Sequence, residues 1–169
     1  MTVFLSFAFC VVLIGLDQLF KFLVTEFLKP IEYIDLIENV LRLRYVENTG
    51  AVFGSFATHT LFLTVFSVVL LGVVIFYLVK NREQSKFVNF FLLLMIAGGI
   101  GNVIDRIRLQ YVIDYIEPLF IDFAVFNFAD CLITVGAFSL IIYLIVDLIK
   151  DIKKEKATKT DVEKNDGNN

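Results

Sequence analysis

Four long apolar stretches, separated by polar segments, dominate the hydrophobic pattern of the chain. They lie at about 3–24, 60–79, 87–104 and 128–149, and the second contains no charged residue. Each is long enough for a membrane-spanning helix, which needs about 20 mostly apolar residues. The pattern therefore predicts a multi-pass membrane protein whose transmembrane part is an all-α bundle of four helices.

The segments between the spans, about 25–59 and 105–127, predict a small β-rich cap on one side of the membrane. Apolar and basic residues alternate from Leu41 to Tyr45, as they do in a half-buried strand. The sequence "ENTG", 47–50, is typical of a turn. Pro30 predicts a break in the helix after the first span.

Basic residues predict the orientation of this bundle. The connector 80–86 contains three of them, and a lysine-rich segment begins at Lys150. Short cytoplasmic loops are enriched in Lys and Arg, so both segments should face the cytoplasm. Both termini would then be cytoplasmic and the cap extracytoplasmic. We expect residues 1–150 to form the membrane domain, and the polar tail, 151–169, to be disordered in the cytoplasm.

Composition narrows the chemistry that such a protein could perform. The chain has one histidine, His59, and two cysteines, Cys10 and Cys131, which lie in different predicted spans. A zinc site or a histidine-based triad has almost no ligands to draw on. The cysteines are best interpreted as small apolar fillers rather than as a disulfide or a metal-binding pair.

Ionisable residues near apolar stretches are the main functional signal. A charged side chain near the bilayer centre costs at least ~2.5 kcal/mol unless a partner or a function compensates. Asp17 and Lys21 are four residues apart on one helix face, which permits a structural ion pair. Asn48 and Gly50, taken alone, indicate only a turn, because both residue types tolerate left-handed backbone conformations.

The stretch "AGGIGNVIDR", 97–106, combines small residues with polar ones. Its glycines would let a neighbouring helix approach closely. Asn102, Asp105 and Arg106 would lie on one side of a helix end. The donor fork of Arg106 suits peptide carbonyls or a lipid phosphate, although a structural contact between Asp105 and Arg106 is an alternative.

Two further aspartates, Asp114 and Asp130, lie in apolar sequence with fifteen residues between them. This connection is short enough to bring them face to face. Two close carboxyl groups cannot both ionise readily, so one keeps its proton and the pair can act as general base and general acid. Asn127 would share a helix face with Asp130. This is the chemistry of an aspartic protease, which needs no histidine, cysteine, serine or metal.

Other interpretations of these carboxylates stay open on the residues alone. Asp130 could simply cap a helix. An ion-coupled membrane carrier also uses buried carboxylates, although four spans without an internal repeat do not favour one. An enzyme acting on lipid headgroups, such as a phosphatase, is disfavoured by the shortage of basic and histidine residues near the outer face.

Five motifs in this order resemble the lipoprotein signal peptidase family, also called signal peptidase II, over about residues 5–145. They are "DQLFK" (17–21), "ENTGAVF" (47–53), "GGIGNVIDR" (98–106), "VIDY" (112–115) and "FNFAD" (126–130). The resemblance implies an aspartic endopeptidase of the bacterial cytoplasmic membrane. Such an enzyme removes the signal peptide of prolipoproteins, cutting before a cysteine that carries a diacylglyceryl group.

The resemblance also implies roles for individual residues. Asp114 and Asp130 match the catalytic pair. The positions matching substrate-binding residues are Asn48, Asn102 and Arg106. The positions matching residues that support the site or the fold are Asp17, Lys21, Gly50, Asp105 and Asn127. Two departures concern details of the site: "NTGAVF" stands for the commoner "NTGAAF", and "VIDY" for "VVDF".

These observations together predict the surroundings of the protein. We expect a monomer whose active site lies near the outer face of the membrane, with the cap able to close over the bound peptide. Its partners would be the diacylglyceryl-modified prolipoprotein and membrane lipids. No cofactor, metal ion or nucleic acid is expected.

Overall fold

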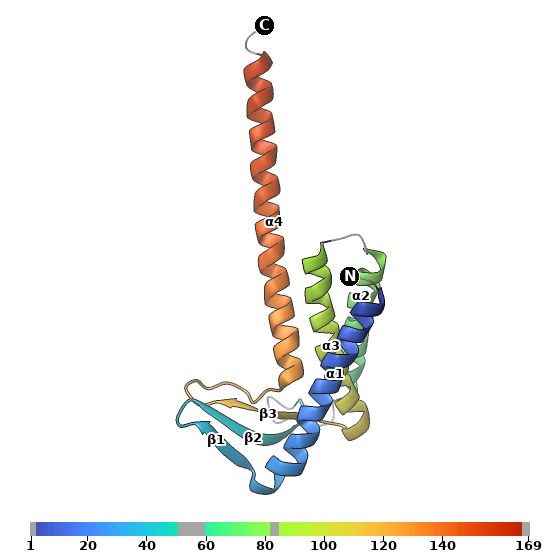
Figure 1. The fold of residues 1–169 in the computed structure, drawn as a ribbon, viewed down its shortest axis with the longest axis vertical. Coiled ribbons are helices and arrows are strands. Elements are labelled where there is room, and N and C mark those ends of the chain that lie inside the picture. The colour runs from blue at the N-terminus through green and yellow to red at the C-terminus, as the bar shows by residue number, and fades with distance from the viewer. Residues whose placement is uncertain (1–2, 51–59, 82–84, 167–169) are drawn as a thin grey trace.

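The computed structural model describes residues 3–50, 60–81 and 85–166, and it places four long helices beside one another with a small sheet at one end (Figure 1). The helices are α1 (Val3–Leu23), α2 (Thr60–Lys80), α3 (Lys86–Leu109) and α4 (Phe128–Asp166). All four are long and apolar enough to span a membrane. The predicted fold class, a four-helix membrane bundle with a β-rich cap, is confirmed.

Helix α3 is the centre of the bundle. It packs against α1, α2 and α4 and contains most of the buried helical residues. A Cβ atom at Gly98 would collide with the backbone oxygen of Ala129, and one at Gly101 would collide with the carboxylate of Asp17. The glycines of the "GGIG" stretch therefore allow the close helix approach that their size predicts.

The cap is an antiparallel sheet of three strands, in the order β1 (Tyr33–Ile37), β2 (Leu41–Asn48) and β3 (Val112–Pro118). Alternate residues of β3 pack against Val24 and Leu28 at the end of the first span. The alternation that predicts a strand from Leu41 onward is confirmed. Pro30 lies in a short 3-10 turn, Lys29–Ile31, which follows a π-helical turn, Val24–Leu28.

Two boundaries differ from those predicted. Helix α3 continues to Leu109, so the first residues of the predicted cap segment 105–127 are helical. Helix α4 continues through Asp166 into the tail predicted to be disordered, and it extends well beyond the other helices (Figure 1). Residues 151–166 contain neither glycine nor proline, and their lysines and glutamates are good helix formers.

Some predicted features fall outside the described residues. Residues 51–59, which belong to the predicted cap and include His59, are among them, as are residues 82–84 of the connector between α2 and α3.

Candidate active site

Asp114 projects from β3 into a buried polar cluster. Its neighbours Ile113 and Tyr115 pack into the apolar cluster beneath the sheet, and side chains alternate along a strand, so Asp114 points to the opposite face. It is 1% exposed. Burial raises the pKa of Asp114 to about 6, against the opposing effect of a hydrogen bond from Asn48.

Two amides hold the carboxylate of Asp114. Asn48 Nδ2 donates to Asp114 Oδ2 at 2.7 Å, and Asn127 Nδ2 donates to Oδ1 at 2.6 Å. Asn48 is the last residue of β2 and pairs with Val112, the first residue of β3, two residues before Asp114. The antiparallel pairing of β2 with β3 therefore positions the amide of Asn48, and the segment preceding α4 positions the amide of Asn127.

Asp130 lies in the first turn of α4. Its Oδ2 accepts a hydrogen bond from the backbone N–H of Asn127 at 3.2 Å, and Asn127 Oδ1 accepts one from the backbone N–H of Asp130 at 3.0 Å. This reciprocal pair is a capping box at the helix N-terminus. The predicted capping role of Asp130 is thus confirmed, but it uses only the Oδ2 atom of the carboxylate. Its Oδ1 accepts a hydrogen bond from Asn102 Nδ2 at 2.7 Å.

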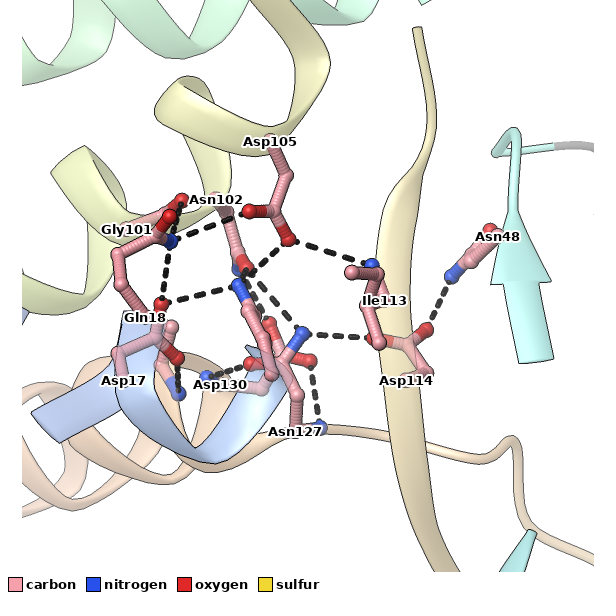
Figure 2. Close-up of polar contacts among 12 residues, drawn as sticks. Asp17, Gln18, Asn48, Gly101, Asn102, Asp105, Ile113, Asp114, Asn127 and Asp130 are labelled. Carbon is pink, nitrogen blue, oxygen red and sulfur yellow. Dashed lines mark hydrogen bonds and ion pairs between the residues drawn. The ribbon is translucent and has the colours of Figure 1, made fainter. Parts of the chain in front are cut away.

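Asn127 joins the two aspartates. Its side chain donates a hydrogen bond to Asp114, and its backbone N–H and side-chain oxygen form the capping box with Asp130 (Figure 2). The backbone of the preceding residue, Phe126, pairs with Ile116 of β3, which fixes the approach of this segment to the strand. The two carboxylates, which the sequence separates by fifteen residues, belong to one hydrogen-bonded cluster.

A buried lysine lies behind this cluster. Lys21 Nζ is 3.0 Å from Asp17 Oδ2 and 2.8 Å from Asp105 Oδ2. It also donates to Asn102 Oδ1 at 3.0 Å. The predicted pairing of Asp17 with Lys21 is confirmed, and Asp105 pairs with Lys21 rather than with Arg106.

These supporting carboxylates also bind backbone groups next to the aspartates of the site. Asp105 Oδ2 accepts from the N–H of Ile113, the residue before Asp114, at 3.2 Å. Asp17 Oδ1 accepts from the N–H of Ala129, the residue before Asp130, at 3.1 Å. A carboxylate from α3 therefore binds the backbone next to Asp114, and a carboxylate from α1 binds the backbone next to Asp130.

Gln18 is a member of this network that the sequence analysis missed. Its Nε2 donates to Asp17 Oδ2 at 3.2 Å, to Asp105 Oδ1 at 3.1 Å and to the carbonyl of Gly101 at 3.4 Å. A polar side chain inside a membrane-length apolar stretch is itself a signal, and Gln18 could have been found by that criterion.

Gly50 closes the turn that follows β2. Its backbone N–H donates to Asn48 Oδ1 at 2.8 Å, and its φ is 81°. This left-handed conformation favours glycine. Glu47 and Asn48 of the predicted turn 47–50 still belong to β2, so the chain turns only from Asn48 to Gly50. The hydrogen bond from Gly50 fixes the oxygen of the amide that binds Asp114.

A cavity of about 230 Å³ opens beside Asp130, between α2, α3 and α4. Its polar end is formed by Asn102, Arg106 and Asp130. The remaining lining is almost entirely apolar and includes Phe66, Leu70, Val74, Met95 and Ile133. Within the described residues Arg106 forms no side-chain hydrogen bond or ion pair, so its guanidinium donors are available to a bound molecule.

The groups that the site offers are carboxylates, amides and one guanidinium. Among the described residues, no three His, Cys, Asp or Glu side chains gather where a metal ion could be held. One buried and one partly exposed carboxyl group beside an apolar cavity suit acid–base attack of water on a carbonyl.

Comparisons with known proteins agree on one family. The family model for signal peptidase (SPase) II matches residues 9–146. The lipoprotein signal peptidase of Streptococcus thermophilus (strain CNRZ 1066) is 43% identical over 132 residues, which cover 78% of this chain and 86% of that protein. The enzyme of the same description from Streptococcus pyogenes serotype M5 (strain Manfredo) is 41% identical over 134 residues, covering 79% and 88%.

The fold is similar to that of a solved bacterial membrane enzyme. The TM-score is 0.78 at 26% sequence identity, and the match covers 86% of this chain and 90% of the other. A second structure of a bacterial membrane enzyme gives a TM-score of 0.77, also at 26% identity.

Proposed function

This chain belongs to the signal peptidase II family, and we propose that Asp114 and Asp130 are the catalytic pair of its reaction. The protein is an aspartic endopeptidase with several membrane spans that removes the signal peptide from prolipoproteins. The observation that carries the proposal is the shared cluster: Asn127 binds both carboxylates, and each also accepts a hydrogen bond from a second amide.

The pair would share one proton during the reaction. The ionised carboxyl takes a proton from a water molecule, whose oxygen attacks the scissile carbonyl carbon, while the protonated carboxyl donates to the carbonyl oxygen. The tetrahedral intermediate then collapses, the C–N bond breaks, and the leaving amine receives a proton from the pair. The products are the signal peptide with a new carboxyl terminus and the lipoprotein with a free amine on its lipidated cysteine.

The cavity beside Asp130 supports a role in substrate binding. Its apolar walls suit an acyl chain or an apolar side chain, because such groups gain free energy when they leave water. At its polar end Arg106 would donate hydrogen bonds to a carbonyl oxygen of the substrate. A diacylglyceryl-modified cysteine supplies both features, an apolar chain and carbonyl groups close to the peptide bond.

The sheet and the site lie at one end of the bundle, whereas α1 begins and α4 ends at the other (Figure 1). The end of α2 at Lys80, the start of α3 at Lys86 and the part of α4 beyond Lys150 lie away from the sheet (Figure 1). With basic segments retained in the cytoplasm, the sheet would face outward and both termini inward. The active site would then meet an anchored substrate at the outer membrane boundary.

The carrier alternative is not favoured, because the family match and the relatives are signal peptidases.

A gel-shift cleavage assay in detergent tests this proposal. The purified parent protein and an Asp130→Asn variant are incubated with a prolipoprotein that either carries or lacks the diacylglyceryl group. We expect cleavage of the lipidated form by the parent and none by the variant, which keeps the size of the side chain but cannot exchange a proton. Equal cleavage by a folded Asp130→Asn variant would remove Asp130 from the catalytic pair.

A further inference from the structure

The side chains of Asn48 and Asn102 face the catalytic carboxylates. Each donates from its Nδ2 at 2.7 Å, Asn48 to Asp114 and Asn102 to Asp130. Both positions were predicted, from the family resemblance, to bind substrate. In the structure the Nδ2 groups of both residues donate to the two carboxylates of the proposed catalytic pair.

The orientation of the Asn102 amide is fixed from behind. Its Oδ1 accepts hydrogen bonds from Lys21 Nζ at 3.0 Å and from Asn127 Nδ2 at 3.1 Å. A flipped amide would turn its NH₂ group toward these two donors and lose both bonds. The oxygen must therefore face Lys21, and the NH₂ group must face Asp130.

Lys21 itself has little freedom. It is 1% exposed, and its ammonium lies between the carboxylates of Asp17 and Asp105. It makes no hydrogen bond with Asp130, but the Asn102 amide connects the two. Through this amide a buried charge on α1 can determine where a carboxylate on α4 points.

Arg106, one helical turn after Asn102, provides the contrast. Both residues line the cavity between α2, α3 and α4. Asn102 is 5% exposed and bonded on both sides of its amide, whereas Arg106 forms no side-chain hydrogen bond within the part of the chain that the structure describes. Of these two residues, only Arg106 keeps its full set of donors for a substrate.

We propose that Asn102 and Lys21 are positioning residues that hold Asp130 for catalysis, in contrast to Arg106, whose role in substrate binding belongs to the proposed function. This inference rests on the proposed function of the Asp114 and Asp130 pair. It divides two neighbouring polar residues of one helix between two tasks, the orientation of a reacting carboxylate and the capture of the substrate.

The division predicts opposite kinetic effects. Asn102→Ala should lower kcat, by about 100-fold if Asp130 shifts by an ångström, and leave KM nearly unchanged. Arg106→Ala should raise KM for a diacylglyceryl-modified prolipoprotein and change kcat less, since a uniform binding interaction affects KM. A rise in KM with unchanged kcat in the Asn102→Ala variant would overturn the positioning role.

A double-mutant cycle tests whether Lys21 acts through Asn102. Lys21→Met should lower kcat, and the Lys21→Met/Asn102→Ala double variant should have the kcat of Asn102→Ala alone, because residues that act through one contact are not additive. Multiplied losses in the double variant would instead show that Lys21 supports the fold independently. Should Lys21→Met fail to fold, Lys21→Gln keeps an N–H donor for Asn102 Oδ1 and should retain more of the kcat than Asn102→Ala does.

Kinetics of the parent protein and of the Asn102→Ala variant separate this inference from the function on which it rests. A folded parent protein that does not cleave lipidated prolipoprotein would contradict the proposed function itself. A parent that cleaves, combined with an Asn102→Ala variant altered only in KM, would contradict only the positioning role of Asn102.

Discussion

The helix junction and the sheet both contain ion pairs, and these differ in burial rather than in length. At the helix junction Lys21 lies 3.0 and 2.8 Å from its two aspartates, whose side chains are 0% and 2% exposed. On the sheet Lys29 lies 2.9 Å from Glu47, with side chains that are 49% and 42% exposed. Distance alone would rank these contacts as equal.

The physical consequences of the two regions are very different. A charge buried without its partner costs several kcal/mol, so each member of the junction cluster depends on the others. Exposed pairs gain little, because water solvates the separated charges almost as well. The buried cluster also contacts Asn102 and the backbone beside both proposed catalytic aspartates, whereas the pair on the sheet does not. Positioning of the site therefore depends on the region from which solvent is excluded.

Removal of the buried lysine gives the largest expected effect. Lys21→Met would leave Asp17 and Asp105 as uncompensated buried charges, and breaking such a cluster costs about 3–5 kcal/mol. Thermal denaturation in detergent measures this as a large fall in the midpoint. A double variant, Lys21→Met/Asp105→Asn, should recover part of the loss because one of the two unpaired buried charges is removed. A denaturation midpoint as high as the parent's in the Lys21→Met variant would contradict the comparison.

Crowding of the same cluster should give an intermediate effect. A methyl group added by Gly101→Ala would meet the carboxylate of Asp17, and overpacking of this kind costs about 1–3 kcal/mol. Gly15→Ala is the matched control, because nothing lies within 4 Å of its added Cβ. We expect a lower denaturation midpoint for Gly101→Ala only. Equal effects of the two substitutions would show that the junction can relax.

The amide at the end of β2 links the sheet to the site, and its removal should shift the pH profile. The hydrogen bond from Asn48 favours the ionised form of Asp114, so its loss raises a pKa that burial already places at about 6. If protonated Asp114 is the acid of the pair, activity falls as pH rises through this pKa. The alkaline limb of kcat/KM should then move to higher pH in Asn48→Ala, whereas a shift to lower pH would contradict the assignment.

The exposed pair should give the smallest effect. Glu47 lies next to Asn48, and its hydrogen bond with Lys29 holds the pKa of Glu47 below its usual value. Because both side chains are exposed, Glu47→Gln should leave the denaturation midpoint and the cleavage rate unchanged within error. A loss of activity comparable to that of Asn48→Ala would show that the sheet positions the site as strongly as the helix junction does.

Much of this architecture could be predicted from the sequence because membranes impose strong patterns. Apolar length predicts the four helices, and alternation predicts β2. The costs of burying charge single out Asp17, Lys21, Asp105, Asp114 and Asp130 as residues that need partners. The turn at Asn48 and Gly50 follows from their backbone preferences.

The partners themselves could not be predicted, since they depend on how the helices are rotated and paired. Sequence spacing suggested Asp105 with Arg106, but the bundle turns Asp105 toward Lys21 on another helix. It likewise places Asn102 where its amide donates a hydrogen bond to Asp130 on α4. The tail after Lys150 is polar enough to resemble a disordered segment, yet α4 continues through it to Asp166. A helix that is already nucleated in the bundle gains one more hydrogen bond with each added residue.

The most direct test of the central claim asks whether Asp114 and Asp130 act as one unit. The kcat for lipidated prolipoprotein is measured for Asp114→Asn, Asp130→Asn and the double variant, with denaturation midpoints confirming that all three are folded. Groups that share one proton are strongly non-additive, so each single variant should lose about 10⁴-fold or more, and the double variant should lose no more than the worse single one. Substantial activity in either folded single variant, or losses that multiply in the double variant, would contradict a catalytic pair.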